Sequence, residues 1–229
     1  MNARRGRRVG EAERARAVEI LDRLGAAMPG ARIELDFGDD LQLLVAVMLS
    51  AQSTDAGVNK ATPALFRAFP DAAAYARAAP EALWPHIRTL GLFRNKAKAI
   101  VAAARAIVAT HGGRVPRTRQ ALEALPGVGR KTAGVVLVHL GAEPAFPVDT
   151  HVGRLARRMG FTRQEDPDRV EEDLRALVPV ERWALGHQLL VWHGRRCCAA
   201  RAPACQRCPV ADLCPRRGVK ARRGAASGA

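Results

Sequence analysis

The sequence predicts an all-α fold, and two observations carry that prediction. Apolar residues recur at three- and four-residue spacing in several segments, which is typical of helices with one buried face. Strands would show two-residue alternation of apolar and polar residues, and no convincing stretch of that kind occurs. The 229 residues, 48% of them hydrophobic, can bury a substantial core in one large domain or two small ones.

The first two expected helices have clear boundaries. One covers 41–49 and follows Asp39 and Asp40, either of which can cap a helix through its carboxylate. The other covers 100–108 and ends before Gly112, since glycine suits the left-handed turn that closes a helix.

Two more helices are expected from their first residues. Asp166 and Pro167 are typical of an N-cap and a first helical residue, and an apolar periodic run follows them. Asp55 could cap a helix over 56–68 in the same way.

The charge balance points to a polyanionic partner. Lys and Arg number 37 against 22 Asp and Glu, and nucleic acid is the leading candidate because binding phosphates releases condensed counterions. Arg-rich composition alone is weaker evidence, since many basic proteins bind nothing specific. The longest apolar run, 41–49, is far shorter than the roughly 20 residues that span a bilayer. We therefore expect no membrane anchor and a cytoplasmic location.

A glycine-rich turn lies between two apolar helical patterns at 122–133 and resembles a helix-hairpin-helix motif. Gly127 and Gly129 can let backbone amides approach a phosphate, and the next helix would present its positive N-terminus beside Arg130. Such contacts position DNA without reading its sequence. The alternative is an ordinary αα-hairpin whose glycines only close the turn.

Lys131 and Asp149 are candidate catalytic residues. Lys131 would lie at the start of the second hairpin helix, where neighbouring positive charge can favour the neutral amine needed for nucleophilic attack. From spacing alone, a phosphate-contacting lysine is the simpler interpretation. Asp149 precedes an apolar periodic run, so it can be a helix cap, a catalytic carboxylate or both. His151 can contact a phosphate or support the start of that helix.

All five cysteines lie within the segment from Cys197 to Cys214. They can therefore stabilise this segment but cannot crosslink the rest of the fold. Four of them have the spacing C-x6-C-x2-C-x5-C, which suits a metal site: Cys198, Cys205, Cys208 and Cys214. Ligand chemistry alone leaves zinc and an iron-sulfur cluster open. Cys197 is expected to be a spare buried thiol. Four arginines near these ligands can present positive charge to DNA: Arg195, Arg196, Arg201 and Arg207.

Together these motifs resemble the bacterial endonuclease III family, within the helix-hairpin-helix DNA glycosylase superfamily. The resemblance rests on Leu-Pro-Gly-Val-Gly-Arg-Lys-Thr-Ala at 125–133 and Val-Asp-Thr-His at 148–151. It implies that Lys131 is a Schiff-base lysine, that Asp149 is a catalytic aspartate and that the four cysteines hold a 4Fe-4S cluster. One departure is Gly134, where many members of the family have asparagine, so the pocket lining can differ.

The resemblance also implies how the duplex is opened. Leu-Ser-Ala-Gln at 49–52 and Gly-Leu-Phe at 91–93 match family segments that carry wedge residues. Gln52 would hydrogen-bond the orphaned base, and Leu92 would insert between base steps. Without the family, Gln52 would be interpreted as a loop amide and Leu92 as a core leucine.

The architecture implied by the resemblance is two helical domains with a DNA groove between them. Residues 1–32 form a basic tail and a helix that belongs to the cluster domain. Residues 33–143 form a six-helix barrel that contains the hairpin, and 144–214 complete the iron-sulfur domain. Residues 215–229 form a flexible basic tail.

The implied function is a bifunctional DNA glycosylase and AP lyase of base excision repair. Its partner would be double-stranded DNA that contains damaged pyrimidines or abasic sites, bound by a monomer at the bacterial nucleoid. One alternative is a monofunctional adenine or mismatch glycosylase, in which the Lys131 position is typically not lysine. Another is a noncatalytic iron-sulfur protein that binds DNA.

Overall fold

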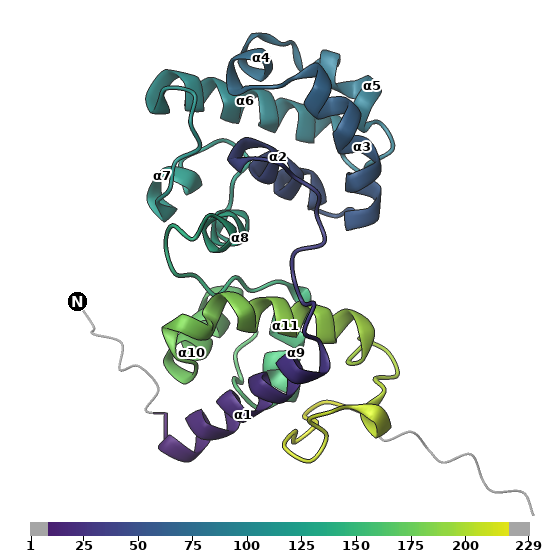
Figure 1. Cartoon of the computed structure of the whole chain (residues 1–229), viewed down its shortest axis with the longest axis vertical. Helices are drawn as coiled ribbons and strands as arrows, with labels where there is room; N and C mark the ends of the chain where they lie inside the picture. The colour runs from purple at the N-terminus through teal and green to yellow at the C-terminus, as the bar shows by residue number, and fades with distance from the viewer. Residues whose placement is uncertain (1–8, 220–229) are drawn as a thin grey trace, which may run out of the picture. The chain divides into compact units, whose positions relative to one another are not determined.

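The computed structural model describes residues 9–219 (Figure 1), and within this range all regular structure is helical, without a strand. The prediction of an all-α fold is confirmed. Residues 9–219 contain no helix whose length and apolar character would let it cross a membrane. The chain divides into two compact units: unit 1 contains 9–32 and 148–219, and unit 2 contains Ile33–Pro147.

Unit 2 consists of short and medium-length helices. Its α-helices are α2 (Asp40–Ser50), α3 (Asp55–Ala68), α4 (Ala72–Arg77), α5 (Trp84–Ile87), α6 (Phe93–His111), α7 (Arg119–Glu123) and α8 (Arg130–Leu140). The 3-10 helix η1 (Pro80–Leu83) runs directly into α5, which is a single turn. This turn adds one helical segment to the six that were expected.

Helix α2 is the centre of unit 2. It packs against α3, α6 and α8, and every side chain of Leu43–Leu49 is buried. A helix that is apolar on all sides is stable only when neighbours surround it, and α2 has them. Because α8 packs directly on this helix, the start of α8 has a fixed position within unit 2.

The helix caps explain where these elements begin and end. Asp39 caps α2 by accepting a hydrogen bond from the backbone N–H three residues on, and α6 ends at Gly112 with φ +58°, as the sequence predicts. The prediction for α3 is wrong by one residue. Thr54 is its N-cap, and Asp55 is the first helical residue. Both side chains suit a cap, so the sequence alone does not separate them.

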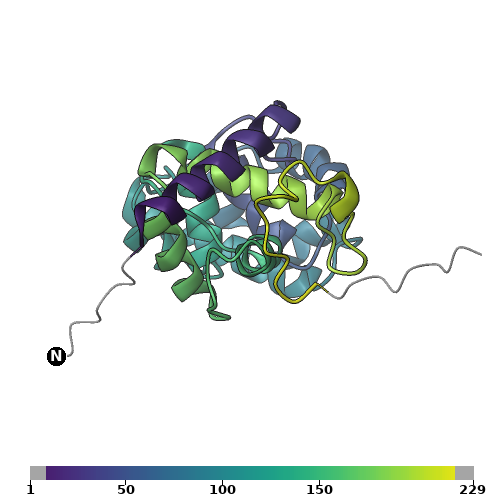
Figure 2. The same cartoon turned by 90° about the horizontal axis from the view of Figure 1, so that it is seen from below.

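Unit 1 contains the other helices and the cysteines. Its elements are α1 (Glu11–Ala27), α9 (Thr150–Arg158), α10 (Pro167–Leu177), η2 (Val180–Arg182), α11 (Trp183–Arg196) and η3 (Cys205–Arg207). Helix α9 packs against α10 and α11, and α1 crosses α10 and α11 (Figure 2). Asp166 caps α10 and Pro167 is its first residue, as the sequence predicts. The first helix of the chain therefore packs in the same unit as the last one.

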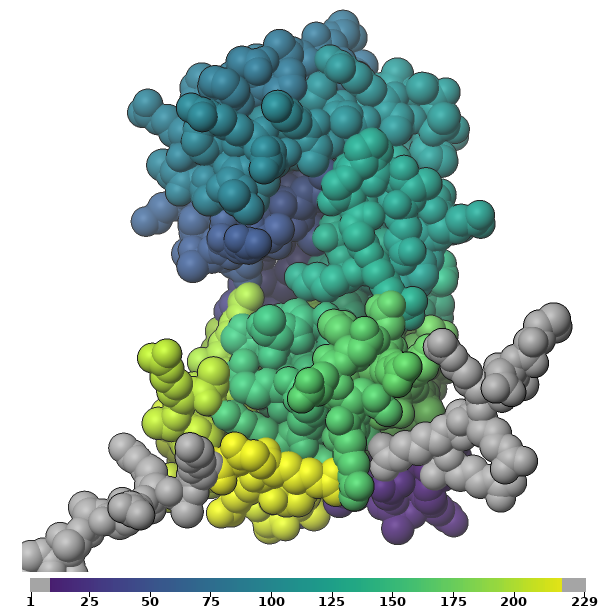
Figure 3. Space-filling view, turned by 180° about the vertical axis from the view of Figure 1, so that it is seen from behind, coloured from purple at the N-terminus to yellow at the C-terminus, as the bar shows by residue number. Residues whose placement is uncertain are grey.

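Two observed boundaries differ from the expected ones. Unit 2 ends at Pro147, beyond the expected 143, because the Pro147 ring packs beside Gly134 of α8. The C-terminal tail was expected to begin at 215, but the largely exposed segment 215–219 is still attached to unit 1 by a hydrogen bond. The backbone N–H of Arg217 donates to the carbonyl of Arg158 at 3.1 Å, and the yellow segment lies on the surface of α9 and the turn after it (Figure 3). The rest of the expected tails, 1–8 and 220–229, lies outside the described residues.

Candidate functional site

The glycine turn between α7 and α8 has the hairpin geometry that the sequence predicts. Gly127 has φ +78°, a left-handed conformation that other residues adopt at a cost. A Cβ built on Gly127 would lie 2.6 Å from Ala99 Cβ in α6. Leu125 and Val128 on either side are buried in the core of unit 2. Gly127 is therefore required by the fold itself, because it lets the turn approach α6.

Gly129 is different from Gly127, although the sequence pattern treats the two alike. It is the N-cap of α8 with φ −89°, and a Cβ built there would meet nothing within 4 Å. Packing therefore gives no reason for glycine at this exposed position. The first N–H groups of α8 have no partner within the helix, so they and Arg130 form a surface suited to a phosphate.

Lys131 is the second residue of α8, and its side chain is exposed. The helix begins there because Gly129 stops the turn and its carbonyl accepts the first intrahelical hydrogen bond, from Ala133 N–H at 2.9 Å. A primary amine in this place is accessible to a large ligand and lies beside the surface, just described, that is suited to a phosphate. It can act as a nucleophile toward DNA or as a phosphate contact.

Asp149 begins α9, in unit 1. Its Oδ1 accepts a hydrogen bond from Val152 N–H at 2.8 Å, so it is the N-cap, as expected. A carboxylate has a second oxygen, so this cap does not prevent a chemical role. His151 is half-buried and packs beside Gly194 of α11, and burial is the main cause that lowers its pKa. These contacts favour the supporting role of His151 over a phosphate contact.

Gln52 and Leu92 belong to adjacent turns of unit 2. Both have left-handed backbone angles, with φ +53° and +58°, although neither is glycine. Gln52 is exposed and Leu92 is 55% exposed, so the interpretation of Leu92 as a core residue is wrong. A Cβ built on Gly91 would lie 3.5 Å from the Gln52 carbonyl oxygen, so the two turns touch. The structure thus places an exposed amide residue and an exposed apolar residue on two neighbouring turns of one unit.

The cysteines of unit 1 line one cavity together with residues of α9 and α11. All five cysteines line it, and none is in a disulfide. Burial raises the pKa of the Cys208 thiol to about 11, so this thiol keeps its proton unless a positive charge enters the cavity. A metal supplies that charge and replaces the proton, which makes the donor set suited to a metal centre.

His193 was not predicted to belong to this cavity, and Cys197, predicted to be a spare buried thiol, is half-buried and lines it. His193 is buried, and its Nε2 lies 3.5 Å from Cys208 Sγ. The ligand atoms of His193, Cys197 and Cys208 all lie within 4.8 Å of one another. Cys197 is therefore half-buried at the cavity and close to an expected ligand. The spacing of His193 four residues before Cys197, one helical turn, is the signal that could have indicated it.

Two arginines of α9, also missed, hold the cysteine loop in place. Arg158 donates to the carbonyls of Ala199 at 2.7 Å and Ala200 at 2.8 Å, and to Cys198 Sγ at 3.3 Å. Arg154 donates to the Cys198 carbonyl at 3.1 Å. The two arginines are four residues apart on one helix face. The loop carbonyls are not hydrogen-bonded within a helix, and the two guanidinium groups donate the hydrogen bonds that they accept.

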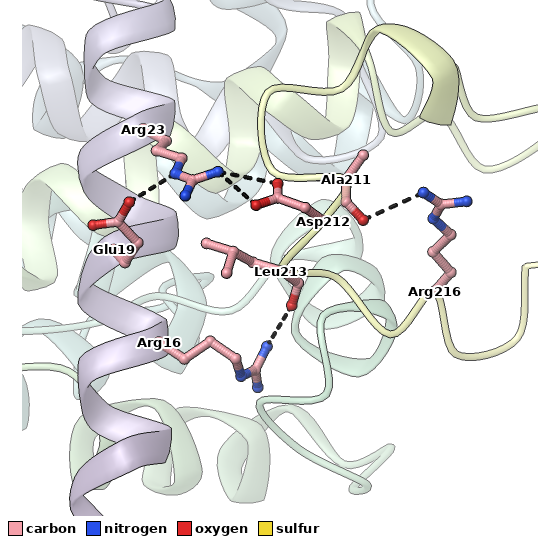
Figure 4. A network of polar contacts seen from close by, with 7 residues as sticks. All are labelled: Arg16, Glu19, Arg23, Ala211, Asp212, Leu213 and Arg216. Carbon is pink, nitrogen blue, oxygen red and sulfur yellow. Dashed lines mark hydrogen bonds and ion pairs between the residues drawn. The ribbon is translucent and has the colours of Figure 1, made fainter.

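The N-terminal helix holds the other end of the same loop (Figure 4). Arg16 donates to the carbonyls of Met159 at 2.9 Å and Leu213 at 3.1 Å. Arg23 pairs with Asp212 at 2.8 Å and with Glu19 in its own helix at 2.7 Å. Helix α1 is thus bound to the residues just before Cys214, although the chain separates them by most of its length.

The arginines expected to surround the cysteines lie on the surface of unit 1. All four are exposed: Arg195, Arg196, Arg201 and Arg207. Arg196 lies over the ring of Trp192 at 3.8 Å, and Arg201 precedes Ala202, whose φ is +47°. This side of the loop can present positive charge to a polyanion.

Comparison with known proteins identifies the family. Residues 45–180 match the model described as HhH-GPD superfamily base excision DNA repair protein. The chain belongs to this superfamily. The match includes the glycine turn, Lys131 and Asp149 as well as Gln52 and Leu92, and it ends before the cysteines.

Several curated members of this superfamily are similar over most of their length. Endonuclease III of Synechocystis sp. is 48% identical over 84% of this chain and 89% of its own. Endonuclease III of Escherichia coli K12 is 43% identical over 85% of this chain and 92% of its own.

Two solved structures share the fold of this chain. A trapped endonuclease III–DNA covalent intermediate superposes with a TM-score of 0.84 at 40% identity, over 89% of this chain and 96% of that one. A thermostable thymine-DNA glycosylase superposes with a TM-score of 0.81 at 23% identity, over 90% of this chain and 98% of that one, which supports the fold alone.

Proposed function

We propose that this protein is a bifunctional DNA glycosylase and AP lyase of base excision repair, acting on oxidised pyrimidines and abasic sites in double-stranded DNA. The observation that carries the proposal is an exposed lysine, Lys131, at the start of the helix that follows the glycine turn. Relatives named endonuclease III, one of them trapped covalently on DNA, support it. We place this action in the cytoplasm, on the bacterial nucleoid, by a monomer.

The chemistry requires one amine to serve two steps. Lys131 Nζ attacks C1′ of the damaged nucleotide, and the bond between C1′ and the base breaks as the base takes up a proton. After the sugar ring opens, the bond to nitrogen is an iminium that acidifies the C2′ proton. Loss of that proton expels the 3′ phosphate by β-elimination, and water then releases the lysine.

Asp149 would assist this reaction by moving a proton or by stabilising positive charge on the sugar as the base leaves. Its cap on α9 fixes the carboxylate in one orientation through Oδ1, which leaves the second oxygen available. The two roles therefore support each other, since a capped carboxylate loses little further freedom during reaction.

A 4Fe-4S cluster is the cofactor proposed for the cysteine cavity, with Cys198, Cys205, Cys208 and Cys214 as its ligands. The four thiols line one cavity, and Arg154 and Arg158 hold the loop between the first two. When bound, the cluster crosslinks this loop and fixes the exposed Arg201 and its neighbours as a DNA-binding surface.

The decisive experiment is borohydride trapping on a duplex with a single oxidised pyrimidine. Borohydride reduces the iminium to a stable amine, so the wild type should form a covalent protein–DNA adduct. Lys131→Gln should form none while keeping affinity for undamaged duplex, and it should fold normally because Lys131 is exposed. Arg130→Gln is the matched control, since it removes the adjacent positive charge and should weaken binding but keep the adduct. An adduct or strand cleavage with Lys131→Gln would reject the assignment.

Asp149→Asn separates catalysis from capping. Asparagine is as good an N-cap as aspartate, so the melting temperature should change little. Base release should slow by about 100-fold or more, as for loss of a general acid–base group. Wild-type turnover on base lesions would mean that Asp149 is only a cap.

A further inference from the structure

Lys96 is a buried lysine in unit 2 that the proposed chemistry does not use. It lies in the first turn of α6 and is only 7% exposed. Its ammonium donates a hydrogen bond to Ser53 Oγ at 2.8 Å. Among residues 9–219 it forms no ion pair, so the Ser53 hydroxyl is its polar partner there. Burial lowers the pKa of Lys96, which shows that the surroundings disfavour its charge. A buried charge with so little compensation needs an explanation beyond packing.

The position of Lys96 supplies that explanation, because it connects the two turns described above. Its backbone N–H donates to the carbonyl of Leu92 at 3.0 Å, and its side chain reaches Ser53, the neighbour of Gln52. The same two turns approach each other at Gly91, where an added Cβ would lie 3.5 Å from the Gln52 carbonyl oxygen. One residue thus holds both turns, through its main chain on one side and its side chain on the other.

Both turns require such support. Gln52 and Leu92 have left-handed backbone angles that cost energy for residues with a Cβ, and such angles persist only where surrounding contacts determine them. Neither side chain can contribute much to its own turn, since both are exposed. The remaining contacts include a backbone bond from Ser53 N–H to the Ser50 carbonyl at 3.0 Å and the bridge from Lys96 to Ser53, which is the side-chain contact that reaches from one turn to the other.

We infer that Lys96 is a positioning residue that fixes Gln52 and Leu92 as one rigid pair for opening the duplex at a lesion. This inference rests on the proposed function and on the wedge roles of the two side chains. A wedge replaces stacking and pairing energy only if it does not bend or retreat as it enters the duplex. With the bridge in place, the conformational cost of both turns is met before DNA binds.

The test compares cleavage of one oxidised pyrimidine in two duplexes, one with a normal opposite base and one with an abasic-site analogue opposite. The second lesion is already unpaired and needs less opening. Lys96→Met keeps the length and apolar stem of the side chain but removes the ammonium. We expect it to lower the ratio of paired to unpaired rates by about tenfold, since small misplacements of positioning groups have effects of this order or larger. Lys98→Met, an exposed lysine of the same helix, is the matched control and should leave the ratio unchanged.

Ser53 provides an independent test on an accessible turn. Ser53→Ala should lower the same ratio, and Ser53→Thr, which keeps the hydroxyl, should restore it. The double variant with Lys96→Met should be no worse than Lys96→Met alone, because both remove one bridge. If the Lys96 and Ser53 variants only damage the structure, cleavage of both duplexes should slow equally. The ratio would then remain as in the wild type, and the inference would be overturned.

Variants of the wedge residues distinguish the wedge roles of Gln52 and Leu92 from the positioning role of Lys96. Gln52→Ala and Leu92→Ala should both lower the ratio. If they do and the Lys96 and Ser53 variants do not, the positioning role is wrong and the proposed function stands. If neither wedge variant changes the ratio, the wedge assignment is wrong and the role of Lys96 is wrong with it. Trapping through Lys131 reports on the glycosylase and lyase proposal independently of both outcomes.

Discussion

The two glycines of the hairpin turn should respond in opposite ways to the same small change. Gly127→Ala adds a Cβ at φ +78°, where it would lie 2.6 Å from Ala99 Cβ. The left-handed angle costs about 1–2 kcal/mol for a residue with a Cβ, and overpacking costs about 1–3 kcal/mol. A central value of about 3.5 kcal/mol for the two together lowers the melting temperature of a chain of this size by about 7–14 °C.

Gly129→Ala adds the same atom where it meets nothing within 4 Å, at an ordinary φ of −89°. Alanine is a poorer N-cap than glycine, so a loss of at most about 1 kcal/mol in the free energy of unfolding is expected. If a phosphate approaches the amides at the start of α8, the new Cβ obstructs it. Affinity for undamaged duplex should then fall by about tenfold, which corresponds to about 1.4 kcal/mol.

The assay pairs thermal unfolding with duplex binding at fixed salt, because phosphate contacts depend strongly on ionic strength. Gly127→Ala should melt early, and Gly129→Ala should melt near the wild type but bind weakly. If Gly127→Ala has the melting temperature of the wild type, the turn can accommodate a Cβ and the close contact with Ala99 does not limit this position. Wild-type binding of Gly129→Ala would show that no phosphate comes close to this position.

Three further changes test other parts of the chain. Cys198→Ser should abolish bound iron and visible absorbance and Cys197→Ser should keep both; the reverse result would make Cys197 the ligand. Arg16→Met removes the hydrogen bond from Arg16 to the Leu213 carbonyl of the cysteine loop, worth about 1 kcal/mol, so a chelator should extract iron about fivefold faster; an unchanged rate would mean that α1 does not hold the loop. Gly134→Asn should lower the melting temperature, because its Cβ would lie 3.2 Å from Pro147 Cγ, and adding Pro147→Ala should recover part of the loss; equal melting of the two variants would exclude that contact.

The elements that the sequence predicts well are those fixed by neighbours along the chain. The apolar run of α2 begins within a few residues of its cap Asp39, and Gly112 directly follows the last residue of α6. Apolar periodicity and helix capping depend on residues within one or two helical turns. They can therefore be recognised in the sequence without knowledge of the tertiary structure. The start of α3 shows how precise such a prediction can be. Asp55 was expected to be the N-cap, but Thr54 is, and either residue type caps a helix well.

The contacts that the sequence does not predict join distant segments. From the sequence, Arg154 and Arg158 would be interpreted as surface charges of α9. The structure shows that they bind the cysteine loop, because α9 packs against α11 and the loop follows α11. Arg16 is similar, because its partners are 143 and 197 residues away. Such partners depend on tertiary packing, and no local pattern encodes them.

The candidate site shows the same division more sharply. Gly127 and Gly129 form one motif in the sequence, and the resemblance assigns both to DNA. The structure separates them: α6 leaves no space for a side chain at Gly127, whereas Gly129 has open space around it. Packing gives no reason for glycine at position 129, at the start of a helix beside Arg130 and Lys131, so the proposed phosphate contact is the interpretation left to test there. Where packing explains a motif residue completely, its presence says little about function, and where packing explains nothing, the functional interpretation gains weight.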